Sequence, residues 1–115
     1  MRIRRKHKYN AKSNVCIHGH RHPSRLESGY CGQLHMLVKA GEIYAYEYER
    51  RFELRVNGIL ICHHKPDFLV FKTKEDHEAD CFEVHEVKGA MTVDWNIRRK
   101  LFEAVYPEVD YIVVR

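Results

Sequence analysis

Two segments of the chain place apolar residues at the three- and four-residue spacing of an amphipathic helix. The first extends from about residue 24 to residue 40, with Ser24 as the expected N-cap and Glu27 three residues later, as in a capping box. The second extends from Val93 to Tyr106, with Asp94 as its expected N-cap. The pattern therefore predicts two helices, each with one apolar face that can cover a sheet.

Elsewhere, apolar residues alternate with polar ones or form short continuous runs, as they do in strands. Asn57-Gly58 separates two such runs and is the strongest hairpin turn signal in the chain. The expected strands are residues 43–48, 51–56, 59–62, 67–72, 81–88 and 111–114. The polar segment 73–80 is expected to be a loop, and segment 14–22 a short hairpin ahead of the first helix.

Helices that alternate with strands predict a single α/β (α+β) domain. Its expected core order is helix, strand, strand, strand, helix, strand, preceded by the short hairpin. The domain would comprise residues 14–115, and residues 1–13 are expected to form a flexible basic arm. A total of 115 residues suits one domain with one core.

The composition is that of an ordinary globular protein, with 44% hydrophobic and 31% charged residues. No run approaches the roughly 18 apolar residues that a membrane span requires. The basic residues at the start are not followed by the apolar stretch of a secretory signal. We therefore expect a cytoplasmic protein without a membrane partner.

Basic residues gather in two places, and the formal net charge is +4. The amino-terminal cluster includes Arg4, Arg5, Lys6, Lys8 and Lys12, and the cluster in the second helix is Arg98, Arg99 and Lys100. Such clusters can bind the phosphates of DNA. A solvated terminus and a solvated helix face are the alternative interpretations. We expect DNA as the partner of both clusters.

Three charged side chains are expected to meet at one edge of the sheet. Glu86 and Lys88 are two residues apart in a strand and so project from the same face. Asp67 begins the preceding strand and would lie opposite them in a hairpin. Convergent carboxylates repel one another unless a cation lies between them, and Mg²⁺ (or Mn²⁺) is the expected ion. The alternative is that Asp67 caps a turn and that Glu86 and Lys88 form a surface ion pair.

The pattern Pro66-Asp67 followed by Glu86-Val87-Lys88 resembles the motif of the PD-(D/E)XK nuclease superfamily. In that family the aspartate and glutamate bind the metal ion, and the lysine assists the attacking water. The resemblance implies these roles for Asp67, Glu86 and Lys88. Many members also carry a glutamate on the first helix, which implies that Glu27 is a further catalytic residue and metal ligand.

The chain also resembles a narrower family of small phage-encoded proteins that are similar to Holliday-junction resolvases. The residues that carry this resemblance are 8–12, 24–27, 39–43, 52–54, 66–68, 86–89 and 100–102. It implies an endonuclease selective for branched DNA in phage recombination or replication, located in the host cytoplasm. A homodimer is expected, because two cuts across a junction need two sites. The stretch Cys62-His63-His64-Lys65 departs from the plainer strand that is usual there.

Two other functions remain open at this stage. The first is a nuclease of the same fold without a preference for junctions. The second is a non-catalytic DNA-binding module that holds zinc. Its possible ligands are Cys16, His18, His20, His22, Cys62, His63, His64, Cys81 and His85, whose spacing fits no zinc-finger pattern. We therefore do not expect structural Zn²⁺, and we expect the four cysteines to be free thiols.

Overall fold

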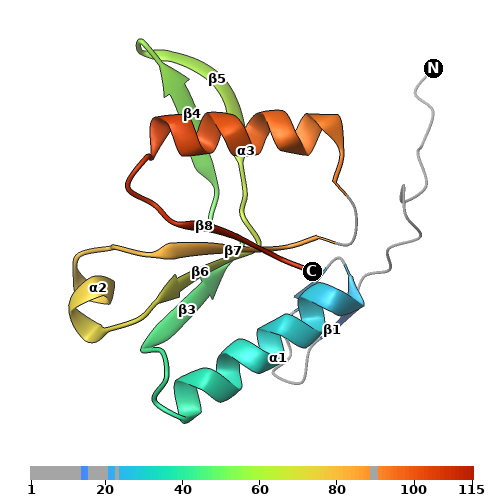
Figure 1. Cartoon of the computed structure of the whole chain (residues 1–115), viewed down its shortest axis with the longest axis vertical. Coiled ribbons are helices and arrows are strands. Elements are labelled where there is room, and N and C mark those ends of the chain that lie inside the picture. Colours follow the sequence, from blue (N-terminus) through green and yellow to red (C-terminus); the bar gives the residue numbers. More distant parts are fainter. Residues whose placement is uncertain (1–13, 16–20, 23, 89–90) are drawn as a thin grey trace.

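The computed structural model describes residues 14–15, 21–22, 24–88 and 91–115 (Figure 1). The elements in chain order are β1 (Asn14–Val15), β2 (Arg21–His22), α1 (Arg25–Lys39), β3 (Ala45–Tyr48), β4 (Phe52–Val56), β5 (Ile59–His64), β6 (Phe68–Phe71), α2 (Lys74–Glu78), β7 (Glu83–Val87), α3 (Val93–Val105) and β8 (Tyr111–Val114). No helix in these ranges is long and apolar enough to cross a membrane.

Four of the strands form the central sheet, in the order β3-β6-β7-β8. The β3–β6 and β6–β7 pairs are antiparallel, whereas β8 runs parallel to β7. Helix α3 connects these two parallel strands, as a parallel pair requires a crossover. The predicted α+β domain is confirmed.

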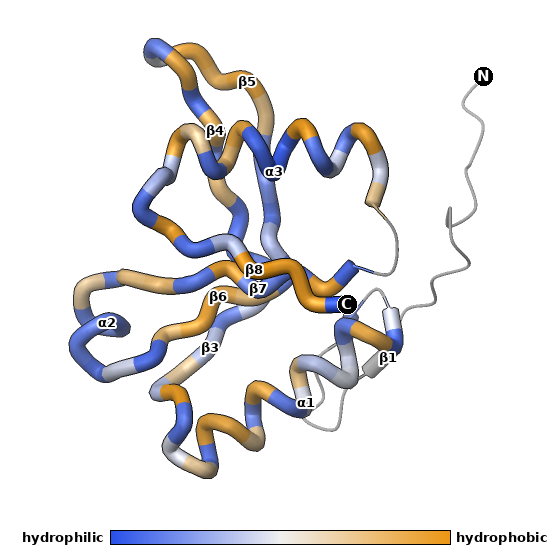
Figure 2. The backbone as a smooth tube through the Cα atoms, viewed as in Figure 1, coloured by the Kyte–Doolittle hydropathy of each residue, from blue (hydrophilic) through white to orange (hydrophobic). Residues whose placement is uncertain are grey.

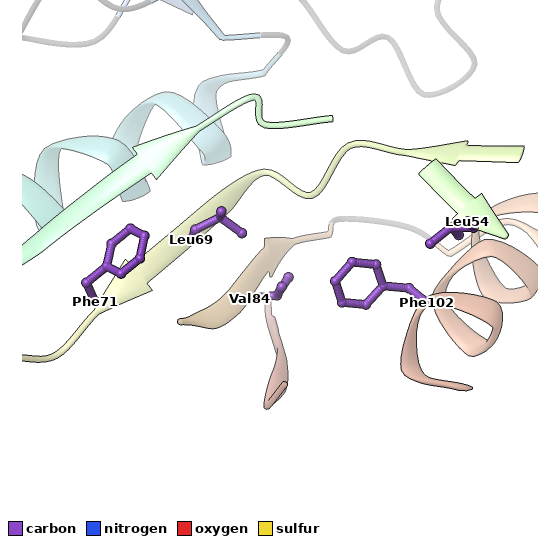
Figure 3. Close-up of a cluster of buried hydrophobic side chains, with 5 residues drawn as sticks. All are labelled: Leu54, Leu69, Phe71, Val84 and Phe102. Carbon is purple, nitrogen blue, oxygen red and sulfur yellow. The ribbon is translucent and has the colours of Figure 1, made fainter. Parts of the chain in front are cut away.

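The core lies on both faces of β6, whose four residues are all buried. Phe68 and Val70 pack against Cys31 and Leu34 of α1. Because side chains alternate along a strand, Leu69 and Phe71 face the other way. There they form a cluster with Leu54, Val84 and Phe102, which Figure 3 shows between the sheet, α3 and β4. The fold therefore has α1 on one face of the sheet, and α3 with part of the β4–β5 hairpin on the other (Figure 1).

The β4–β5 hairpin stands outside the four-stranded sheet. Its turn consists of Asn57 and Gly58, which have φ angles of 51° and 78° and so match the positive-φ turn that the sequence indicates. Leu54 anchors the hairpin in the core. Toward the turn, Ile59 and Ile61 of β5 are 65% and 55% exposed, and Figure 2 shows this apolar strand away from the sheet.

All five strands expected between the two long helices are present, but only β3, β6 and β7 of these belong to the central sheet, because β4 and β5 pair with each other. Two other expectations about local structure are wrong. Segment 73–80 contains the helix α2, which Thr73 caps by accepting a hydrogen bond from the backbone N–H of Asp76. The N-cap of α3 is Thr92 and not Asp94, because the Thr92 hydroxyl accepts from Trp95 N.

The other element predictions agree with the structure. Ser24 caps α1 by accepting a hydrogen bond from Glu27 N at 3.2 Å. Gly41, just beyond the end of α1, has a φ of 77°. The expected hairpin ahead of α1 is present as the antiparallel pair β1–β2, with Asn14 opposite His22. The turn of that hairpin falls outside the described residues.

Two glycines should respond in opposite ways to alanine. Gly29 lies within α1 with no atom near the position of an added Cβ, so Gly29→Ala should stabilise the fold by about 0.5–1 kcal/mol. Gly58→Ala should destabilise it by about 1 kcal/mol or more, because its positive φ is unfavourable for an L side chain. Urea unfolding of both variants measures the two shifts. A loss of stability in Gly29→Ala would contradict the helical assignment of this exposed position.

Candidate functional site

Strands β6 and β7 bring Asp67 and Glu86 together at one end of the sheet. Phe68 pairs with His85, so that the next positions outward, Asp67 and Glu86, stand opposite each other. Asp67 is fixed there because its Oδ2 accepts a hydrogen bond from Val87 N at 2.8 Å. Glu86 is almost completely buried, with 2% of its surface exposed. The expected opposition of Asp67 and the Glu86 end of the strand is confirmed.

Helix α1 contributes Glu27 from its first turn. The Ser24 cap fixes this turn, and the Glu27 side chain is 5% exposed. Glu27 Oε2 lies 2.8 Å from Nδ1 of His22, the last residue of β2. The negative charges of Asp67 and Glu86 both raise the pKa of Glu27, so the three carboxylates lie within range of one another.

Burial dominates the electrostatics of this site. The pKa of Glu27 is raised to about 9, chiefly by loss of hydration and then by hydrogen bonding to Asp67 and by the charge of Asp67. Burial also raises the pKa of Glu86 to about 8, with the charge of Asp67 as the next cause. A hydrogen bond from Tyr111 and the charge of Lys88 oppose that rise. Without a cation, both glutamates therefore favour their protonated forms at neutral pH.

Lys88 follows β7 and lies on the same side as Glu86. Its Nζ is 4.0 Å from Glu86 Oε1 and 5.1 Å from the centre of the Trp95 ring. Trp95 belongs to the first turn of α3, so a cation–π contact with this helix holds the ammonium group beside the carboxylates. All four predicted residues, Glu27, Asp67, Glu86 and Lys88, are therefore placed at one end of the sheet.

The donor set fits a hard divalent cation. In the described part of the chain, no three His, Cys, Asp or Glu side chains are already arranged around a single point. Mg²⁺ requires fewer, because one or two carboxylates suffice when water and a substrate phosphate supply the other ligands. Asp67 and Glu86 provide such a pair of oxygen ligands, with Glu27 nearby. Oxygen donors suit Mg²⁺ or Mn²⁺.

The described cysteines are spread through the fold as free thiols. Of the zinc candidates, Cys62 is half-buried on β5 and Cys81 is exposed after α2, whereas Cys31, which is not a candidate, is buried in the core. His64 lies against Phe102 of α3, whereas His85 contacts Tyr30 of α1 on the opposite face of the sheet. His22 lies against Glu27, and His63 pairs with Glu53 in the β4–β5 hairpin. The candidates Cys16, His18 and His20 fall outside the described residues.

The basic cluster of α3 lies close to the carboxylates. The positive charges of Arg98 and Lys88 both lower the pKa of His64, which borders the site. Arg99 stacks over Trp95 at 5.4 Å and pairs with Glu103. Lys100 is exposed. The other predicted DNA contacts, Arg4, Arg5, Lys6, Lys8 and Lys12, fall outside the described residues.

Two residues beside Glu86 were missed by sequence reasoning. Tyr111, the first residue of β8, donates its hydroxyl hydrogen to Glu86 Oε2 at 2.7 Å. His64, the last residue of β5, has its Nε2 2.8 Å from the same hydroxyl oxygen. Burial is the main reason why the pKa of His64 falls to about 4, so this imidazole is neutral at physiological pH. Sequence reasoning had named His64 only as a possible zinc ligand within the unusual Cys-His-His-Lys stretch, and not as a partner of the carboxylates.

A comparison with protein families gives one match. The family model described as "Protein of unknown function (DUF1064)" matches residues 6–115. No curated protein and no solved structure matches the chain.

Proposed function

The chain belongs to the DUF1064 family, whose description assigns no activity, and we propose that it is a metal-dependent endonuclease that hydrolyses DNA phosphodiester bonds. The observation that carries the proposal is the convergence of Asp67, Glu86, Lys88 and Glu27 at one end of the sheet. Burial and the neighbouring Asp67 raise the pKa of both Glu27 and Glu86, and carboxylates perturbed in this way are often found at functional sites.

Asp67 and Glu86 would hold the divalent cation, with Glu27 as a further ligand. When bound, the cation would polarise a phosphate oxygen and promote ionisation of an attacking water. Lys88 would orient this water and stabilise negative charge that develops on the phosphate, because its ammonium group already lies next to Glu86. The water adds its hydroxyl group to phosphorus and its proton to the departing sugar oxygen, as the bond between phosphorus and that oxygen breaks.

The DNA backbone would approach the site along α3. Arg98 and Lys100 are exposed on this helix, and Arg98 lies near enough to influence His64 beside Glu86. Arginine and lysine at such positions contact phosphates and fix the orientation of a duplex without reading its sequence. We further propose that the substrate is branched DNA and that two copies of the chain act together, since each copy carries one site and resolution of a junction requires two cuts.

The test is cleavage of a labelled four-way junction and a matched linear duplex in Mg²⁺, in Mn²⁺ and in EDTA. We expect paired, symmetric cuts in the junction with either metal ion and no cuts in EDTA. Light scattering during the same preparation should give the mass of a dimer. Cleavage of both substrates would support the nuclease activity and contradict the preference for junctions. Tight binding of DNA without cleavage under any condition would refute the nuclease and favour a binding module.

A further inference from the structure

A series of hydrogen bonds through two buried side chains and the half-buried Tyr111 ends at Glu86. It joins His64 of β5, Tyr111 of β8 and Glu86 of β7, three elements that are far apart in the sequence. The phenol hydrogen of Tyr111 is donated to Glu86 Oε2, so the phenol oxygen accepts a hydrogen bond from His64 Nε2. His64 and Glu86 are only 4% and 2% exposed. Water therefore has little opportunity to replace either hydrogen bond.

These hydrogen bonds make the two oxygens of the Glu86 carboxylate different from each other. Oε2 is bound by the Tyr111 hydroxyl and lies 4.0 Å from His64 Nε2. Oε1 is the oxygen next to the Lys88 ammonium group, at 4.0 Å. The carboxylate group is thus held in one orientation, with Oε1 facing Lys88.

Accepting the metal site of the proposed function, we propose that His64 and Tyr111 are positioning residues that hold Glu86 Oε2, so that Oε1 alone binds the catalytic ion beside Lys88. Partners of this kind orient the ligands of metal sites, and their loss typically lowers metal affinity about 10–100-fold. The role also explains a buried histidine at the end of a hairpin that takes no part in the central sheet.

Packing alone does not require the two polar groups. The ring of Tyr111 contacts the rings of Phe102, Trp95 and His64, and a phenylalanine would make the same contacts. Burial of a hydroxyl group and an imidazole is unfavourable unless each is hydrogen-bonded, and among the described residues the bonds of Tyr111 and His64 Nε2 lead to Glu86. The ring of Tyr111 therefore serves packing, whereas its hydroxyl group serves to hold Glu86.

The decisive variant is Tyr111→Phe, which removes one oxygen atom and keeps the ring. Its matched control is Tyr106→Phe, since Tyr106 also packs against Phe102 but directs its hydroxyl toward Glu53 O at 3.5 Å. Titration with Mn²⁺, followed by electron paramagnetic resonance, should give a Kd about tenfold or more higher for Tyr111→Phe. The Kd of Tyr106→Phe should stay within about twofold of the wild type, because its hydroxyl does not contact Glu86.

Two substitutions of His64 provide an independent test. His64→Gln keeps a side-chain N–H that can reach the Tyr111 oxygen, whereas His64→Leu removes it. We expect glutamine to retain most of the Mn²⁺ affinity and leucine to lose as much as Tyr111→Phe. Saturating Mn²⁺ should restore most of the cleavage rate of all three variants, because the lesion affects metal binding. If Tyr111→Phe does not fold, the His64 pair decides the question.

The outcomes separate this inference from the proposed function. Wild-type Mn²⁺ affinity in both Tyr111→Phe and His64→Leu would overturn the positioning role and leave the metal site intact. Equal losses in Tyr111→Phe and Tyr106→Phe would also overturn it, since packing would then be the cause. A wild-type protein that binds no Mn²⁺ would refute the metal site itself, and the positioning role with it.

Discussion

Asp67→Asn should lower metal-dependent cleavage about a thousandfold or more, because a lost carboxylate ligand removes several kcal/mol of charge stabilisation from the transition state. The substitution keeps the size of the side chain and its amide oxygen can still accept from Val87 N. The fold should therefore survive. Single-turnover cleavage of the four-way junction, combined with Mn²⁺ titration, measures the loss of activity and of metal affinity together.

Two further variants make the Asp67 result specific. Asp110→Asn removes an exposed carboxylate just before β8 and should leave cleavage unchanged. Lys88→Met should lower cleavage but not Mn²⁺ binding, because the ammonium group acts on the water and phosphate and is not a ligand. Cleavage by Asp67→Asn at the wild-type rate would refute the assignment of the site.

The metal-free protein should become less stable, relative to Glu86→Gln, as the pH rises. The pKa of Glu86 is raised from 4.5 to about 8, so the folded protein binds this proton more tightly than the unfolded chain. The resulting stabilisation is complete below pH 4.5 and is lost as the pH rises to about 8. At pH 5 the two proteins should have similar Tm values in EDTA. At pH 8.5 we expect Glu86→Gln to melt roughly 5 °C or more above the wild type.

Magnesium should reverse this difference. Ligands must lose their protons to bind a metal ion, and an ion that binds only the folded state stabilises it. Mg²⁺ should therefore raise the wild-type Tm more at pH 8.5 than at pH 5, with little effect on Glu86→Gln. Glu108→Gln, at an exposed position, should follow the wild-type profile. A gap between wild type and Glu86→Gln that does not widen with pH would contradict the buried, crowded environment of Glu86.

The sequence was sufficient for those parts of the site that local pattern determines. Alternation along β7 places Glu86 and Lys88 on one side, and a hairpin between β6 and β7 brings Asp67 opposite. The cap at Ser24 fixes where α1 begins and thus where Glu27 lies. Each of these inferences depends on residues within one element or on two strands that pair as neighbours. The function itself stays a prediction.

Features that depend on distant partners were not predictable from the sequence. Apolar and polar residues alternate along β4 and β5 as they do along the strands of the central sheet. The local sequence therefore does not indicate that these two strands pair with each other outside that sheet. Tyr111 contacts Glu86 from 25 residues away and His64 from 47 residues away, through a tertiary arrangement that periodicity does not encode. Thr92 and Asp94 are both good N-caps, and only the backbone decides between them.

The parallel pairing of β7 with β8 also has a kinetic consequence. Strands β6 and β7 are consecutive strands with only the helix α2 between them, whereas β8 can dock only after the longer α3 has crossed the sheet. Such long-range parallel pairing is intrinsically slow. Tyr111 arrives at Glu86 with this strand. During refolding, the chain should therefore acquire helices and the β6–β7 hairpin before it acquires full metal affinity. The appearance of tight Mn²⁺ binding would mark the final step of folding.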